Sequence, residues 1–192
     1  AYEKASDREY ILYIKPCCAS AAYVMFEVNL YEPKLFQDTT VESENPGMNN
    51  AFGGIAFLGN TRMYGEQWLY TRPDFSKMPE MLDRPIRKAV WHLPKLGGAD
   101  VRLTAHEASA RFCSFGSNWT NQIAAAALET ESCACNGYVD LDVTHILTDS
   151  KTGFIKRSEG WVVRTKVKGS GFAAVATGDS YYAPQILELN FQ

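Results

Sequence analysis

A set of acidic and histidine side chains comes closest to the residue types and spacing that catalysis needs. Asp140 and Asp142 lie two residues apart with His145 after them, and His106 stands next to Glu107. Two carboxylates hydrolyse a glycosidic bond when they flank it on opposite sides. On a strand, however, Asp140 and Asp142 share one face and cannot flank a bond. We therefore interpret Asp140 as solvent-facing, Asp142 as a helix cap and His145 as an ordinary surface or packing residue.

The rest of the sequence adds no catalytic pattern to these residues. It contains no nucleophile elbow, no HExxH pattern and no Ser–His–Asp order. We therefore predict no catalytic residues and a protein that is not an enzyme. A polysaccharide hydrolase or lyase that uses Asp140 or Asp142 is the less favoured alternative.

Aromatic residues in polar loops indicate a different chemistry, the binding of sugars. Pyranose C–H faces pack on flat rings while neighbouring polar groups bond the hydroxyls. Trp119 lies in the run Ser-Asn-Trp-Thr-Asn, and two tyrosines follow the turn Gly-Asp-Ser at 178–180. Packing of Trp119 within its loop or the core is the preferred interpretation of that residue, and stacking on a ligand is the alternative. The candidate ligand-binding residues are Trp119, Asn118, Asn121, Tyr181 and Tyr182.

Composition excludes several classes of protein. The 192 residues are 46% hydrophobic and 21% charged, which is typical of a globular chain. A net charge of −3 without a basic stripe argues against a nucleic-acid partner. No apolar run approaches the roughly 20 residues that span a bilayer. The polar start at Ala1 leads us to expect loss of an initiator Met and no secretory signal, although removal of a signal is the alternative.

The five cysteines do not form a recognisable framework. Cys17 and Cys18 are adjacent, so on a strand they would point to opposite faces. Cys133 and Cys135 are too close for the usual zinc spacing. We interpret the cysteines as buried or free thiols, with a structural disulfide or a crosslink through Cys17 or Cys18 as the alternative. No metal ligand set is identified. The one metal hypothesis is a structural calcium ion, because oxygen-rich residues gather at Asp38, Glu42, Glu44 and the Asp179 turn.

The elements that must position these residues read as short strands. Aromatic residues make up 12% of the chain and favour strands, and Gly, Ser, Asp and Pro turns separate the apolar runs. Many short strands with almost no helix indicate a β-sandwich or barrel. The expected strands are two within Tyr10–Leu30 (the second Tyr23–Tyr31), Ile55–Leu58, Trp68–Phe75, Ile86–Leu93, Val101–Glu107, Tyr138–Val143, Trp161–Val167, Phe172–Ala176 and Gln185–Phe191. The strand residues Trp68, Trp91 and Trp161 are expected in the core.

Two segments bear on helix content. Asp142 is a natural N-cap for a short helix near 143–150. The alanine-rich stretch Gln122–Thr130 has high helix propensity, but it is short for an independent helix.

The second half of the chain resembles the DNRLRE, or disaggregatase-related, domain family of bacterial, archaeal and some phage-encoded surface proteins. Motifs in the family's order carry the likeness over residues 50–191: an aromatic strand ending Asp74-Phe75-Ser76 and Met78-Pro79, an Ile86 strand, a Trp119 loop, the junction Tyr138-Val-Asp-Leu-Asp-Val-Thr, Gly160-Trp161, and a terminal Pro184-x-Ile strand. Cys113, the Cys133/Cys135 region and Glu32–Asn60 depart from the pattern, and the N-terminal segment of residues 1–32 has no counterpart in it.

The resemblance implies an all-β, jelly-roll sandwich of antiparallel strands, similar to carbohydrate-binding modules and without catalysis. It also implies that Gln122–Thr130 is strand or loop. We expect residues 33–192 to form this sandwich and residues 1–32 to be N-terminal strands that serve assembly or docking. The expected function is that of a structural or attachment subunit on the surface of a larger assembly, either a virion (phage decoration or fibre) or a cell-surface filament. Its expected partners are other protein subunits of that assembly, and we expect it to form a homo-oligomer. The alternative is a carbohydrate-binding module for surface polysaccharide.

Overall fold

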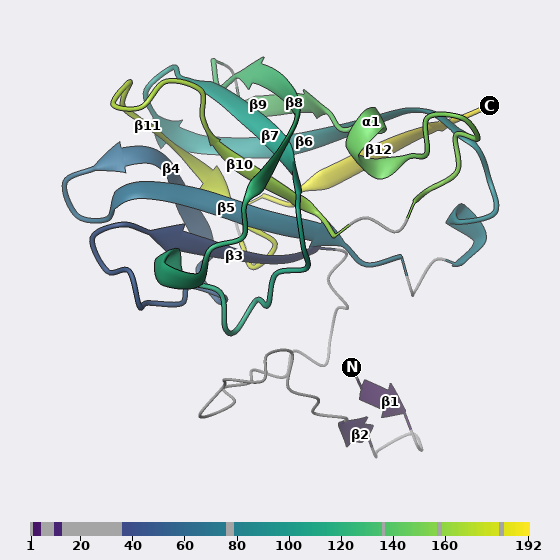
Figure 1. Ribbon diagram of the computed structural model, residues 1–192, viewed down its shortest axis with the longest axis horizontal. Helices are drawn as coiled ribbons and strands as arrows, with labels where there is room; N and C mark the ends of the chain where they lie inside the picture. Colours follow the sequence, from purple (N-terminus) through teal and green to yellow (C-terminus); the bar gives the residue numbers. More distant parts are fainter. Residues whose placement is uncertain are drawn as a thin grey trace.

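The computed structural model describes residues 2–4, 10–12, 36–75, 79–135, 137–156, 159–180 and 183–192 (Figure 1). The strands are β1 (Tyr2–Lys4), β2 (Tyr10–Leu12), β3 (Phe36–Glu42), β4 (Ile55–Thr61), β5 (Gly65–Pro73), β6 (Ile86–Gly98), β7 (Arg102–Ala108), β8 (Ala125–Cys133), β9 (Tyr138–Asp142), β10 (Trp161–Thr165), β11 (Phe172–Ala176) and β12 (Ile186–Phe191). The helices are short: η2 (Pro79–Met81), η3 (Trp119–Asn121) and α1 (Thr144–Leu147).

All the strand pairs of the main sheet are antiparallel. Its order is β12-β6-β11-β4-β5-β10-β7-β8, with β3 added to β5 and β9 added to β6. The long strand β6 pairs with β12 and β9 through its first part and with β11 through its end. Strand β5 pairs first with β4 and then with β10. The sheet therefore curls, and its β6 half faces its β5 half.

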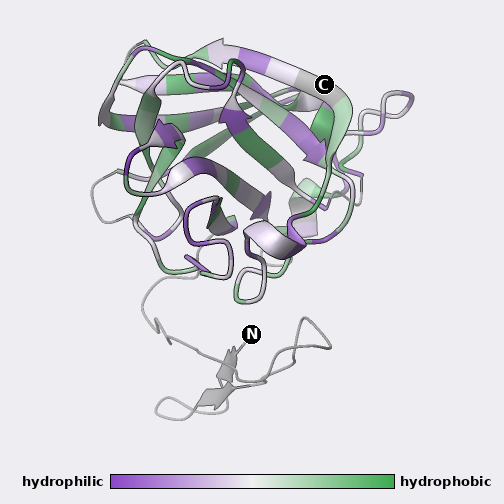
Figure 2. Cartoon of the chain, turned by 60° about the vertical axis from the view of Figure 1, so that its left-hand side comes forward, coloured by the Kyte–Doolittle hydropathy of each residue, from purple (hydrophilic) through white to green (hydrophobic). Residues whose placement is uncertain are grey.

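A continuous core fills the space between the two halves. Trp91 of β6 and Trp161 of β10 are fully buried, with ring centroids 5.4 Å apart and near-perpendicular planes. Phe36 of β3 packs against both rings. Apolar and polar residues alternate along the strands, as Figure 2 shows by colour, because successive side chains point to opposite faces. The fold is therefore an all-β, jelly-roll-like sandwich, as the sequence predicts.

Two local predictions have clear outcomes. Ala125–Cys133 is strand β8, which pairs with β7, so the expectation of strand or loop for this stretch is confirmed despite its helix propensity. The cap of α1 lies one residue later than predicted, at Val143. Asp142 still accepts a hydrogen bond from the Thr144 N–H (3.0 Å), so it satisfies the backbone group that we expected it to satisfy.

The N-terminal segment is described in part. β1 pairs with β2 in an antiparallel ladder in which Glu3 lies opposite Ile11. The predicted strand Tyr23–Tyr31 lies outside the described residues. Within the part of the chain that is described, no helix has the length and apolar character that a membrane span requires.

Candidate functional site

The outer face of strands β5, β10 and β7 carries side chains that converge on one groove. Leu69 and Val163 point into the core, so the adjacent residues Trp68 and Arg164 point outward. In the β10–β7 ladder, Arg164 lies opposite Thr104. Residues far apart in the sequence are thereby placed side by side on one sheet face.

The segment 109–124 crosses this face and covers part of it. It contributes to a second apolar cluster, the outer cluster, separate from the main core. Tyr70 is fully buried there, and its hydroxyl donates a hydrogen bond to the Ile123 carbonyl at 2.8 Å. Burial raises the pKa of Tyr70 well above its ordinary value. The outer cluster comprises Val41, Tyr70, Ala108, Phe112 and Val162, with Trp68, Trp119 and Ile123 packed against it.

The η3 turn fixes Trp119 at the edge of the outer cluster. Asn118 caps the turn: its side-chain oxygen accepts from the Thr120 and Asn121 N–H groups, and its own N–H donates to Asn121 Oδ1 (2.7 Å). The Trp119 ring lies 5.1 Å from the Trp68 ring, measured between centroids. Trp119 therefore both packs and borders the groove, whereas Asn118 and Asn121 serve the hydrogen bonds of their own turn.

The groove is open, with a volume of about 660 Å³. The Arg164 guanidinium carbon lies 5.0 Å from the centroid of the Trp68 ring. The Trp68 indole N–H donates to Glu66 Oε1 (2.9 Å), and the Lys168 ammonium pairs with Glu66 Oε2 (3.1 Å). Among the described side chains, Arg164 makes no ion pair. The lining residues are Glu66, Trp68, Thr104, His106, Trp119, Arg164, Thr165, Lys166 and Lys168.

His106 supports the floor of the groove. Its side chain is 95% buried, with Nδ1 3.2 Å from the Ala126 carbonyl oxygen and Nε2 3.1 Å from Thr104 Oγ1. A carbonyl oxygen can only accept, so Nδ1 carries a proton. The Thr104 hydroxyl, 3.1 Å from Nε2, also donates to the Arg164 carbonyl oxygen at 3.5 Å.

The structure does not bring the acidic and histidine candidates into one site. Asp140 of β9 bonds His92 Nδ1 of β6 at 2.8 Å, and Glu188 of β12 bonds His92 Nε2 at 3.2 Å. His145 is exposed, and Glu107 pairs with Lys156 (2.8 Å) on the inner side of β7. His106 lies in the groove on the other half of the sheet. Asp140 is bonded to His92 and Asp142 to Thr144, so neither of them joins His106 or Glu107 in one site.

Asp38 and Glu42 of strand β3, two of the residues considered for calcium, accept hydrogen bonds from N–H groups. Asp38 accepts from the Gly178 N–H, and buried Glu42 accepts from the side-chain amides of Asn45, Asn50 and Gln67. Among the described residues, no group of three or more His, Cys, Asp or Glu side chains could hold a metal ion.

The cysteines differ from the preferred interpretation. Cys133 and Cys135 form a disulfide, with Cα atoms 5.2 Å apart, so the expectation of thiols at these two positions is wrong and the alternative of a disulfide holds. Cys113 is buried. The candidate crosslink residues Cys17 and Cys18, and the candidate ligand residues Tyr181 and Tyr182, lie outside the described residues.

No family model matches the chain, and no curated protein matches it either. The site therefore rests on its own geometry.

Sequence reasoning missed most residues of the groove, among them Trp68 and Arg164. Trp91 and Trp161 lie in the main core as expected, whereas Trp68 faces outward and packs, partly buried, against the outer cluster. The alternation of β5 gives no clear signal for Trp68, because the polar residues Gln67 and Thr71 share the inner face with Leu69 while Tyr70 is buried on the outer face. Arg164 stands in β10 between the buried residues Val163 and Thr165, and this position marks it as outward-facing.

Proposed function

We propose that the chain is a non-catalytic attachment module that binds carbohydrate in the groove beside Trp68 and Trp119. The observation that supports binding is the position of two indole rings next to Arg164, whose guanidinium has no carboxylate partner among the described side chains. Aromatic rings supply a surface for the C–H face of a sugar, and the guanidinium supplies several N–H donors.

The charge of the groove favours an acidic sugar. Arg164, Lys166 and Lys168 line it, against the single carboxylate of Glu66. Lys166 is itself bonded to Glu131, and Lys168 to Glu66, so Arg164 is the cation best placed to meet a ligand. A guanidinium binds a carboxylate or sulfate through two parallel hydrogen bonds. A uronate or sulfated residue therefore fits better than a neutral hexose.

The proposal includes a place on the surface of a larger assembly, either a virion or a cell. The Cys133–Cys135 disulfide supports a location outside a reducing cytosol, and the resemblance to DNRLRE domains supports an adhesive role. The native mass by light scattering, with and without a reducing agent, tests the assembly role. We expect an oligomer, and a monomer under both conditions would remove that part of the proposal.

Binding is tested on an array of neutral, uronate-containing and sulfated oligosaccharides. We expect acidic members to bind and Arg164→Met to weaken them about tenfold, because hydrogen bonds to a charged group contribute about 1.5–3 kcal/mol. Methionine keeps an apolar contact with Trp68. Trp119→Ala should also weaken binding, whereas Tyr138→Ala, an exposed aromatic on the other half of the sheet, should not. Absence of binding, or equal binding by all variants, would overturn the proposal.

A further inference from the structure

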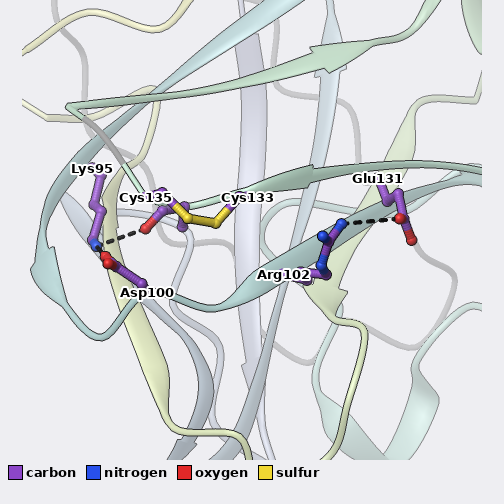
Figure 3. The surroundings of a disulfide bond; sticks show 7 residues. Lys95, Asp100, Arg102, Glu131, Cys133 and Cys135 are labelled. Atoms are coloured by element: carbon purple, nitrogen blue, oxygen red, sulfur yellow. Dashed lines mark hydrogen bonds and ion pairs between the residues drawn. A yellow bond between two sulfur atoms is a disulfide. The ribbon is translucent and has the colours of Figure 1, made fainter.

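The disulfide between Cys133 and Cys135 lies where β8 ends and the chain turns toward β9 (Figure 3). The intervening Ala134 is fully buried. Its N–H donates to the Val101 carbonyl (2.8 Å), and its own carbonyl accepts from the Lys95 ammonium (2.6 Å). These hydrogen bonds hold the turn without involving either sulfur atom.

Two cations lie in the neighbourhood of the disulfide ring, and each is directed toward a carboxylate (Figure 3). Arg102 is the register partner of Cys133 in the β7–β8 ladder, so the two side chains share a face with Cβ atoms about 5 Å apart. Lys95 lies on the other side of the ring, as Figure 3 shows. Asp100 and Glu131 hold these cations in place, at 2.8 Å and 3.2 Å respectively. Positive charge near a sulfur atom stabilises a thiolate and so assists its departure, and the paired carboxylates reduce this effect without removing it.

We propose that this disulfide is a thiol-exchange site, at which a low-molecular-weight thiol forms a mixed disulfide with Cys135. Cys135 is exposed and Cys133 is half-buried, so an incoming thiolate reaches the Cys135 sulfur first. The thiolate forms a new S–S bond with Cys135. The ring S–S bond breaks, and its electron pair leaves on the Cys133 sulfur. A second thiol displaces Cys135 as a thiolate, so the protein gains two electrons and the two small thiols are oxidised to one disulfide.

Opening the ring should leave the sandwich folded. A disulfide stabilises a fold mainly by closing a loop in the unfolded chain, and this effect grows with loop length. Here the loop has three residues, so the restriction is near its minimum. The hydrogen bonds of Ala134 to Val101 and Lys95 persist after opening. These features distinguish an exchangeable disulfide from a structural one.

The test incubates the full oxidised chain with excess reduced glutathione, followed by acid quenching and mass spectrometry of the peptide that contains residues 133–135. We expect one glutathione on Cys135 as the first product, and an unfolding midpoint that changes by no more than a few degrees after the ring opens. Arg102→Gln should slow the reaction several-fold, while Arg62→Gln, an exposed arginine in the β4–β5 turn, should not.

Three results would overturn the proposal. They are a first adduct on Cys133, a ring that stays oxidised in excess thiol, and loss of the folded state on opening. None of these depends on glycan binding, so the test is independent of the groove.

Discussion

Replacing Tyr70 with Phe tests whether one hydrogen bond fixes the segment that covers the outer cluster. The Tyr70 ring is fully buried, and its hydroxyl donates to the Ile123 carbonyl at 2.8 Å. The substitution keeps the ring and removes only the hydroxyl. Loss of a hydrogen bond costs about 0.5–1.5 kcal/mol, and a carbonyl left without a donor raises the cost to about 1–3 kcal/mol. We therefore expect the free energy of unfolding to fall by about 2 kcal/mol.

Thermal unfolding measures this loss. For a chain of this size each kcal/mol shifts Tm by about 2–4 °C, so Tyr70→Phe should lower Tm by about 4–8 °C. Tyr138→Phe removes a hydroxyl from an exposed ring and serves as the control, with an expected change within about 0.5 kcal/mol. Equal Tm values for the two variants would refute the reasoning.

The pH dependence gives a second readout of the same hydroxyl. Burial raises the pKa of Tyr70 in the folded chain above its value of about 10 in the unfolded chain. The stability that the neutral hydroxyl contributes is thus complete below about pH 10. It is lost as the pH rises from there toward the folded pKa. The wild type should lose stability more steeply above pH 10 than Tyr70→Phe does.

Two further predictions concern other parts of the sheet. Burial lowers the pKa of His92, but hydrogen bonds to two carboxylates outweigh burial and raise the pKa. The stability that protonated His92 contributes is therefore complete below about pH 6.5 and disappears as the pH rises through the raised pKa. Asp140→Asn should lower the pKa of His92 in an NMR titration, and an unchanged value contradicts this account. Gly59→Ala should destabilise by about 3 kcal/mol or more in denaturant titration, because φ is +122° and an added Cβ would lie 2.2 Å from the Gly171 carbonyl oxygen. At Gly47 an added Cβ meets nothing within 4 Å, so a comparable loss there would contradict the steric argument.

The strands could be predicted because their signal is local. Alternation in Tyr138–Val143 and the apolar runs of β10 and β11 reflect side chains that face either the core or solvent. Helix propensity at Gln122–Thr130 predicts a helix instead. This preference is weak, because alanine favours a helix by less than about 1 kcal/mol per residue over most other residues. Pairing with β7 along most of β8 outweighs that preference.

The groove could not be predicted because it depends on long-range placement. Trp119 meets Trp68 only because the segment 109–124 folds back across β5 and β10. No sequence pattern within residues 109–124 predicts which strands this segment crosses. Arg164 reads as an ordinary outward-facing strand residue until the register with β7 places it beside Thr104. The sequence could suggest Trp119 as a candidate, but not the partners that make a groove around it.

The two apolar clusters give the groove and the scaffold different stabilities. The main core joins both halves of the sheet, whereas the outer cluster holds one loop on one face. Regions with few buried contacts open locally at lower free energy than the whole fold, so the segment 109–124 should exchange its amide hydrogens before β6 or β10 does. A ligand that contacts Trp119 and Trp68 together binds only the closed loop. At a concentration one hundred times its Kd it adds about 2.7 kcal/mol to the closed state. Ligand binding should therefore slow exchange in 109–124 more than in the core strands, and uniform slowing would show that loop and sandwich open as one unit.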